Sequence, residues 1–177
     1  MKLKKNNIVL VGMTGVGKTT VGRFLSKEIS CSFIDIDIEI EKATNLKIKD
    51  FFKTYGEDEF RKIEKSIFIE NFYKYKYSVI SPGAGIFYDK EIIDIILNES
   101  TCIFLKAKID YLISRLKKNI SNRPMLNEGK LEETLKQMYT ERIKYYAKSH
   151  ITIDVEETSI SDILSKILKA LMHYEKI

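Results

Sequence analysis

GMTGVGKT, residues 12–19, matches the pattern G-x-x-x-x-G-K-[ST] at every position. It follows an apolar run that is typical of a short buried strand, Asn7–Val11, and it leads into Thr19–Ile29, whose apolar residues have helical spacing. Glycines in such a loop permit positive φ angles and let backbone amides point inward, so the loop and the helix start form a nest for phosphate oxygens. The order of strand, loop and helix therefore predicts a phosphate-binding P-loop.

The P-loop pattern assigns roles to individual residues. Lys18 is expected to reach the β and γ phosphates of ATP, and the Thr19 hydroxyl is expected to bind Mg²⁺. The predicted nucleotide-binding residues of this loop are Gly12, Gly15, Val16, Gly17, Lys18, Thr19 and Thr20. An ordinary glycine-rich turn is the alternative, and chance alone produces the pattern in roughly one chain in a few hundred of this length.

The rest of the chain alternates strand-like runs with amphipathic helices. Further strands are expected at Ser32–Ile36, Tyr77–Ser81, Thr101–Leu105 and His150–Asp154, and helices at Asp37–Ala43, Ile48–Tyr55, Glu57–Lys74, Lys90–Leu97, Ile109–Lys117, Leu131–Tyr146 and Ile160–His173. Because parallel strands need helical crossovers, this order predicts a three-layer α/β/α P-loop kinase fold with a five-stranded parallel sheet. We expect one kinase domain over residues 1–177, with a mobile lid at about 119–130, where the sequence is polar and rich in turn formers.

Composition excludes several classes of protein. Hydrophobic residues make up 44% and charged residues 31% of the chain, which is typical of globular proteins, and no apolar run is long enough to span a bilayer. The lysine-rich start, Met1–Asn7, lacks the apolar core and cleavage site of a signal peptide, so we expect a cytoplasmic location. The two cysteines, Cys31 and Cys102, favour reduced thiols over a disulfide framework or a metal cluster.

The net charge of +5 raises the possibility of nucleic-acid binding. Lysines alternate with acidic residues along the helical stretches, however, which is the pattern of a solvated helix face. An anionic nucleotide and an anionic second substrate also favour a mildly basic protein through electrostatic steering. We therefore predict small-molecule partners, no nucleic acid and no membrane, for a chain that acts as a monomer.

Two aspartates, Asp35 and Asp37, lie at the end of the second expected strand. At i and i+2 of a strand they would lie on one face at its carboxyl end, which borders the ligand crevice of an open α/β sheet. Asp37 is suited to orient a substrate hydroxyl and to accept its proton late in phosphoryl transfer, while Asp35 would lie nearer to Mg²⁺. A helix cap at Asp37 is the alternative, and capping is compatible with function.

Further motifs follow in a fixed order along the chain. They are Phe33-x-Asp35-x-Asp37, Gly56-Glu57-Asp58-Glu59-Phe60-Arg61, the turn Gly83-Ala84-Gly85, Arg123-Pro124-Met125-Leu126 and Glu141-Arg142. With the P-loop, they make the chain resemble, nearly end to end, the shikimate kinase family. The resemblance implies transfer of the γ-phosphate of ATP to the 3-hydroxyl of shikimate, a step of chorismate and aromatic amino acid biosynthesis.

The resemblance also implies roles for these residues. Asp37, Arg61 and Arg142 would hold shikimate beside Gly83, Ala84 and Gly85, since two guanidinium groups can grip a carboxylate while Asp37 accepts from ring hydroxyls. For Arg61 alone, the alternative is a surface salt bridge with Glu57 or Glu64. For Arg142 alone, it is an ion pair across its own helix face, with Glu141 or with a residue near Met138.

Arg123 would be a lid residue that binds ATP and stabilises charge on the transferred phosphoryl group, so Lys18, Asp37 and Arg123 are the predicted catalytic residues. Basic residues approach the adenine in relatives, and Arg115 or Lys117 are the candidates here.

Ala84 departs from the family pattern, which has glycine at all three positions of this turn. Alanine does not adopt a positive φ angle cheaply, so we expect an effect on rate or on substrate fit. Two other functions stay open on the sequence alone: another P-loop small-molecule kinase, of the gluconate or nucleoside monophosphate type, and a non-catalytic nucleotide-binding module.

Overall fold

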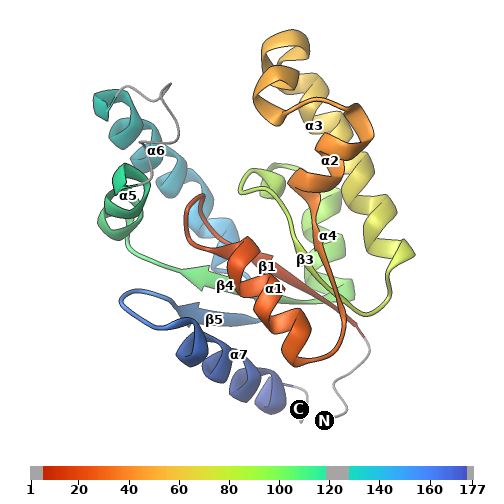
Figure 1. Ribbon diagram of the computed structural model, residues 1–177, viewed down its shortest axis with the longest axis vertical. Coiled ribbons are helices and arrows are strands. Elements are labelled where there is room, and N and C mark those ends of the chain that lie inside the picture. Colours follow the sequence, from red (N-terminus) through yellow and green to blue (C-terminus); the bar gives the residue numbers. More distant parts are fainter. Residues whose placement is uncertain (1–5, 119–127, 175–177) are drawn as a thin grey trace.

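A parallel sheet of five strands forms the centre of the computed structural model, which describes residues 6–118 and 128–174 (Figure 1). The strands are β1 (Asn7–Val11), β2 (Ser32–Asp35), β3 (Ser78–Ser81), β4 (Ser100–Lys106) and β5 (Ile151–Asp154). Their order across the sheet is β2-β3-β1-β4-β5, and every neighbouring pair is parallel. The predicted five-stranded parallel sheet is confirmed.

Helices cover both faces of this sheet. They are α1 (Lys18–Glu28), α2 (Ile36–Thr44), α3 (Ile48–Lys74), α4 (Lys90–Glu99), α5 (Ile109–Lys118), α6 (Glu128–Tyr146) and α7 (Ile160–Tyr174), with a 3₁₀ turn at Ile86–Tyr88. The connection from β1 to β2 runs toward the β2 edge of the sheet. The later connections, from β2 to β3, from β3 to β4 and from β4 to β5, all run toward the β5 edge. Because such crossovers are right-handed, α1 lies on one face and α3, α4 and α6 lie on the other. Helix α7 returns to pack beside α1, which completes three layers (Figure 1).

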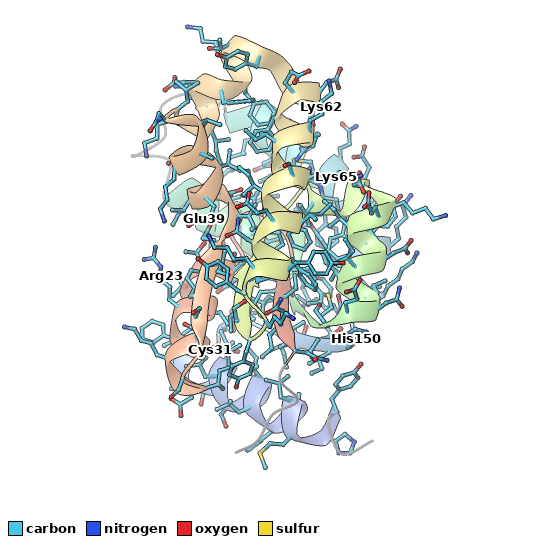
Figure 2. All side chains as sticks on the ribbon, turned by 90° about the vertical axis from the view of Figure 1, so that its right-hand side faces the viewer. Arg23, Cys31, Glu39, Lys62, Lys65 and His150 are labelled. Carbon is cyan, nitrogen blue, oxygen red and sulfur yellow. The ribbon has the colours of Figure 1, made fainter. Side chains whose placement is uncertain are left out.

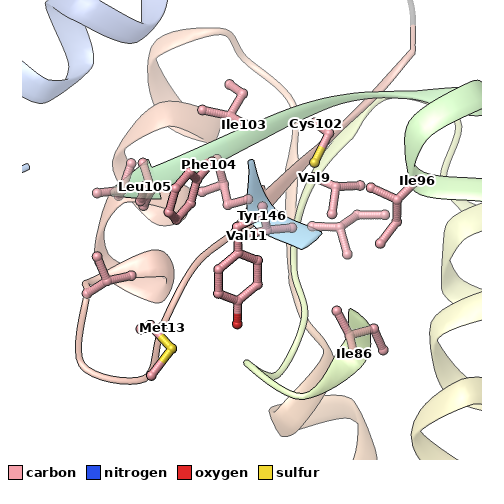
Figure 3. Packing of buried hydrophobic residues seen from close by; sticks show 14 of the residues in the cluster. Val9, Val11, Met13, Ile86, Ile96, Cys102, Ile103, Phe104, Leu105 and Tyr146 are labelled. Carbon is pink, nitrogen blue, oxygen red and sulfur yellow. The ribbon is translucent and has the colours of Figure 1, made fainter. Parts of the chain in front are cut away.

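The central strand β1 is buried along its whole length. It pairs with β3 through Val9 and Ile80 and with β4 through Val11 and Phe104. A continuous apolar run is typical of a parallel strand that is covered on both faces. Figure 3 shows the resulting core around Val9, Val11 and Tyr146.

The second strand ends earlier than predicted. Asp35 is the last residue of β2 and also the N-cap of α2, where its Oδ1 accepts a hydrogen bond from the Ile38 amide at 3.4 Å. Asp37 therefore lies in the first turn of α2, so the prediction that both aspartates share a strand face is wrong. The cap is Asp35 rather than Asp37, because a carboxylate at this position satisfies an amide at the helix start and ends the strand.

Gly56 divides α3 into two helical segments. Its backbone has φ 80° and ψ −180°, outside the helical range, which confirms the predicted break between Tyr55 and Glu57. A Cβ at this position would meet nothing within 4 Å, so the positive φ angle alone favours glycine here. The break sets the start of the segment that carries Arg61.

The lysines of α3 agree with the expectation of solvated faces. Figure 2 shows Lys62 and Lys65 on the outer side of this helix. Lys62 pairs with Glu59 at 2.6 Å and Lys65 pairs with Asp89 at 2.8 Å. Along the described residues, no helix is long and apolar enough to cross a membrane.

The lid predicted at about 119–130 falls mostly outside the described residues, which resume at Glu128. Helix α6 begins there, three residues before the expected start at Leu131.

Candidate active site

The carboxyl ends of β1, β2 and β3 meet at one edge of the sheet. The chain leaves β1 toward β2 on one side and leaves β3 toward β4 on the other, so this edge is the topological switch point at which α/β proteins bind ligands. The P-loop follows β1, Asp35 ends β2, and the turn Gly83–Gly85 follows β3. The predicted site residues within the described chain are placed around this edge or packed against it.

The P-loop has the backbone that its sequence predicts. Gly12, Gly15 and Gly17 adopt φ angles of 146°, 78° and 108°. At Gly12 a Cβ would also lie 2.6 Å from the carbonyl oxygen of Leu105, so both conformation and space require glycine there. Gly17 is the N-cap of α1 and adds no side-chain cap, which leaves the amides of the helix start available to an anion.

Lys18 is buried in the curl of the loop. Its Nζ donates to the carbonyl oxygens of Gly12 at 2.9 Å and Met13 at 3.4 Å. Burial lowers the pKa of Lys18 to about 8, although the Asp37 and Asp35 carboxylates act in the opposite direction, and the Arg142 charge lowers the pKa further. These four charged groups therefore lie close enough to influence one another, as the sequence predicted.

Thr19 and Asp35, the two residues predicted to lie at a metal ion, are in direct contact. The Thr19 hydroxyl donates to Asp35 Oδ2 at 2.7 Å. A hydroxyl and a carboxylate supply hard oxygen ligands, and Mg²⁺ characteristically uses one or two such groups together with water and substrate phosphates. Within the described residues there is no group of three or more His, Cys, Asp or Glu side chains that could hold a metal ion. The Thr19 and Asp35 oxygens fit the ligand preference of Mg²⁺, and the metal role of both residues stays a prediction.

Arg61 and Glu64 form a partly buried ion pair that faces Asp37. Arg61 Nη1 donates to Glu64 Oε2 at 2.6 Å, and Nη2 donates to Glu57 Oε1 at 3.0 Å. Both partners considered for a surface salt bridge of Arg61, Glu57 and Glu64, are therefore paired with it. The surface location is wrong for Glu64, however, because its side chain is only 3% exposed. Burial raises the pKa of Glu64 in spite of the Arg61 charge.

Asp37 is the carboxylate at the centre of the site. Burial raises its pKa, and the Asp35 carboxylate raises it further, while Lys18 and Arg61 oppose this change. The Asp37 side chain is thus within electrostatic reach of both the P-loop lysine and the α3 arginine. A carboxylate with a raised pKa is a better proton acceptor than an exposed aspartate.

The turn Gly83–Gly85 lies directly against these side chains. A Cβ added to Gly83 would lie 2.7 Å from Glu64 Oε1 and 3.0 Å from Asp37 Oδ1, and one added to Gly85 would meet the Arg61 guanidinium. Ala84 between them does not have a positive φ angle. The strain expected from alanine in this turn is therefore absent, because the close approaches occur at the two glycines.

Arg142 comes from α6, on the opposite side of the turn. It is only 5% exposed, so it is not a solvated surface side chain. Its positive charge is one of the influences that lower the pKa of Lys18, and it opposes the rise in the pKa of Glu64 that burial causes. Arg142 therefore faces the same site as Arg61. Arg123 lies outside the described residues, and its role stays a prediction.

A cavity of about 420 Å³ lies beside the P-loop. Val16, Gly17 and Thr20 line it on one side, and Tyr111 and Arg115 line it on the other. Arg115 Nη1 donates to the Val16 carbonyl at 3.3 Å. Of the two basic residues considered for the adenine, Arg115 is at this cavity, whereas Lys117 pairs with Glu132.

Two contributors to this site were not predicted from the sequence. Glu64 was considered only as a partner of Arg61 in a surface salt bridge, although it is buried against Gly83. Tyr146 was assigned no role, yet its hydroxyl donates to the Ala84 carbonyl at 2.7 Å. Spacing along α6 was the available signal, since Tyr146 follows Arg142 by four residues, one turn further along the same helix face.

Comparison with known proteins decides the family. The shikimate kinase family matches residues 14–172. The chain belongs to the shikimate kinase family. A shikimate kinase of Oceanobacillus iheyensis is 38% identical over 169 residues, which are 96% of this chain and 91% of the relative.

Solved structures agree with this family assignment. A shikimate kinase from Acinetobacter baumannii in complex with shikimate superposes with a TM-score of 0.87 at 29% identity, over 96% of this chain and 94% of that one. A gluconokinase from Sinorhizobium meliloti superposes with a TM-score of 0.61 at 16% identity, over 99% of this chain and 96% of that one. The second likeness shows the shared fold alone.

Proposed function

We propose that this chain is a shikimate kinase, which transfers the γ-phosphate of ATP to the 3-hydroxyl of shikimate and releases shikimate 3-phosphate and ADP. The observation that carries this proposal is the convergence of Asp37, Arg61 and Arg142 beside Lys18 at one edge of the sheet. Shikimate is a carboxylic acid with three ring hydroxyls, so it matches two guanidinium groups and an acceptor carboxylate. Membership of the family and the solved Acinetobacter complex with shikimate support the same substrate.

The acceptor side binds and orients the alcohol. Arg61 and Arg142 hold the substrate carboxylate through charge-assisted hydrogen bonds, and Gly83 and Gly85 let the chain pass close beneath the ring. Asp37 accepts a hydrogen bond from the 3-hydroxyl and aims it at the γ-phosphorus. As the new oxygen–phosphorus bond forms and the bond to the β-phosphate oxygen breaks, the hydroxyl proton moves to an Asp37 carboxylate oxygen.

The nucleotide side holds the phosphate chain. Amides of the P-loop and of the start of α1 donate to the phosphate oxygens, and Lys18 Nζ leaves the Gly12 carbonyl to pair with the β and γ phosphates. We assign Mg²⁺ to Thr19 Oγ1 and, through a bound water, to Asp35; when bound, the ion would neutralise charge on the β and γ phosphates. Arg123 is assigned to the lid, where closure would bring its charge to the transferred phosphoryl group and exclude water.

The alternative functions are weaker on specific grounds. The likeness to a gluconokinase extends to the fold only, and gluconate kinase activity has no site observation that favours it over shikimate. The non-catalytic alternative rested on Ala84, whose backbone has no positive φ angle. Lys18, Asp35 and Asp37, which a degenerate kinase would be expected to lose, are all present.

The proposal extends to the organisation of the protein. We assign residues 1–177 to one kinase domain, because one sheet and one connected core carry both substrate sides. We further propose that the protein acts as a monomer in the cytoplasm. Size-exclusion chromatography with light scattering tests the monomer.

A panel assay tests the function itself. Coupled ADP release is measured with Mg-ATP and with shikimate, gluconate or AMP as acceptor. We expect turnover that depends on shikimate and stays at the background rate with the other two. Turnover with gluconate or AMP but not with shikimate would assign the chain to another kinase class.

A further inference from the structure

A hydrogen bond from Tyr146 links helix α6 to the turn Gly83–Gly85. The Tyr146 hydroxyl donates to the carbonyl oxygen of Ala84 at 2.7 Å, across 62 positions of the sequence. Tyr146 is only 1% exposed and Ala84 is half-buried, so this hydrogen bond is partly shielded from water. Loss of the donor would leave the Ala84 carbonyl without its hydrogen bond from the core, which makes the contact costly to break.

The Tyr146 ring is fixed by its neighbours. Phe87 packs edge-on against it with ring centroids 5.5 Å apart, and Phe104 of β4 packs on it at 5.3 Å. Figure 3 shows the ring among Val11 and Phe104 in the core. Two aromatic contacts hold the ring in one orientation, so the position of the hydroxyl is set by the core rather than by the site.

The turn itself has two different sides. The missing side chains of Gly83 and Gly85 make room for Asp37, Glu64 and Arg61. The Ala84 carbonyl is bound by Tyr146, and the Ile86 amide closes the turn on the Gly83 carbonyl at 3.2 Å. The turn thus carries no side chain where it faces Asp37, Glu64 and Arg61, and its Ala84 carbonyl is bound to the core through Tyr146.

Helix α6 supplies both the anchor and a charged group of the site. Arg142 and Tyr146 are four residues apart and therefore lie on one helix face, one turn from each other. Both are buried. A hydrogen bond from Tyr146 to the turn therefore fixes the separation between the Arg142 side of the site and the Gly83–Gly85 side.

We infer that Tyr146 is a positioning residue for the acceptor substrate, setting the distance between Arg142 and the turn Gly83–Gly85 without touching the substrate. The inference rests on the proposed function for its effect on kinetics. Whatever the acceptor is, the hydrogen bond from Tyr146 is expected to hold the turn Gly83–Gly85 in place.

Tyr146→Phe tests the inference, because it removes one oxygen and keeps the ring contacts. KM for shikimate, KM for ATP and kcat are measured, with the thermal midpoint as a check of folding. We expect KM for shikimate to rise about tenfold and KM for ATP to change less than about twofold. Tyr145→Phe is the matched control, since Tyr145 is a half-buried neighbour whose ring instead contacts Lys144 and Lys148, and its kinetics should equal those of the wild type.

Amide hydrogen exchange of a peptide that covers residues 83–86 gives a readout independent of activity. We expect exchange in this peptide to be about tenfold faster in Tyr146→Phe than in the wild type, with α1 unchanged. An unchanged exchange rate, or an equal rise in both KM values, overturns the positioning role. If the wild type does not turn over shikimate, the proposed function fails, and the exchange experiment still decides whether Tyr146 holds the turn.

Discussion

The Arg61 guanidinium lies against the backbone of Gly85, where an added Cβ would be 2.5 Å from Nη1 and 2.7 Å from Nη2. Glu64 accepts a 2.6 Å hydrogen bond from the same guanidinium. Arg61 is thus held by a buried carboxylate while it lies against a backbone segment that carries no side chain at residue 85. Its position depends on the absence of a side chain at residue 85.

Gly85→Ala should damage acceptor binding more than folding. Gly85 has φ −90°, which alanine adopts without strain, and the clash involves the far end of a flexible arginine that can move. We expect KM for shikimate to rise roughly tenfold or more, because the guanidinium is displaced from the carboxylate it binds. Steady-state kinetics with varied shikimate and varied ATP check this.

Ala84→Gly is the matched control for Gly85→Ala. It restores three glycines to the turn, and because Ala84 carries no positive φ angle, shikimate KM should stay within about twofold of the wild type. A large improvement in Ala84→Gly, or an unchanged KM in Gly85→Ala, would show that the steric account of the turn is wrong.

Local patterns were sufficient to predict the sheet and the P-loop. Alternating strands and helices predicted all five strands to within two residues, and the loop glycines have the positive φ angles that their pattern requires. These features depend on residues close together in the sequence, where periodicity and glycine placement act directly.

The environment of the second substrate could be predicted only in part. Asp37, Arg61 and Arg142 were identified through their motifs, and the structure brings them together. The burial of Glu64 and the hydrogen bond from Tyr146 to Ala84 depend on packing between segments far apart in the chain. The strand end at Asp35 was missed because a capping carboxylate competed with the strand pattern.

Thr19→Val should weaken the use of Mg²⁺. Valine keeps the volume of threonine but removes the hydroxyl that lies 2.7 Å from Asp35 Oδ2. We expect the Mg²⁺ concentration for half-maximal activity to rise about tenfold, since one oxygen ligand is lost. Titration of activity with Mg²⁺ at fixed ATP measures this. Thr19→Ser, which restores a hydroxyl, should return most of the Mg²⁺ response, and equal titration curves for all three proteins would refute the metal assignment.

Gly22→Ala should destabilise the fold. A Cβ at Gly22 would lie 2.3 Å from Phe33 Cε2, at the contact between α1 and β2. Alanine gains about 1 kcal/mol of helix propensity over glycine, but overpacking typically costs about 1–3 kcal/mol. We expect a net loss of about 1 kcal/mol in the free energy of unfolding, measured by urea denaturation. The loss should shrink in the double variant with Phe33→Leu, and additive effects of the two changes would contradict the proposed clash.

Cys102 should be inert in the folded protein. It is 0% exposed, and burial raises its thiol pKa from 9.0 to about 12. A raised pKa keeps the thiol protonated, so the associated stability is present below pH 9 and is lost as pH rises toward 12. Iodoacetamide at pH 8 should label half-buried Cys31 first and Cys102 only in denaturant. In Cys31→Ser, native labelling as fast as that of denatured protein would contradict the burial of Cys102.

Shikimate-dependent ADP formation by the wild type and by Asp37→Asn tests the central claim most directly, with Mg-ATP affinity and circular dichroism measured on both proteins. The account predicts that the wild type forms ADP and shikimate 3-phosphate in equal amounts. It also predicts that Asp37→Asn keeps its fold and its Mg-ATP affinity but loses about 100-fold or more in kcat. A folded wild type that binds Mg-ATP without phosphorylating shikimate, or an Asp37→Asn variant as active as the wild type, would contradict it.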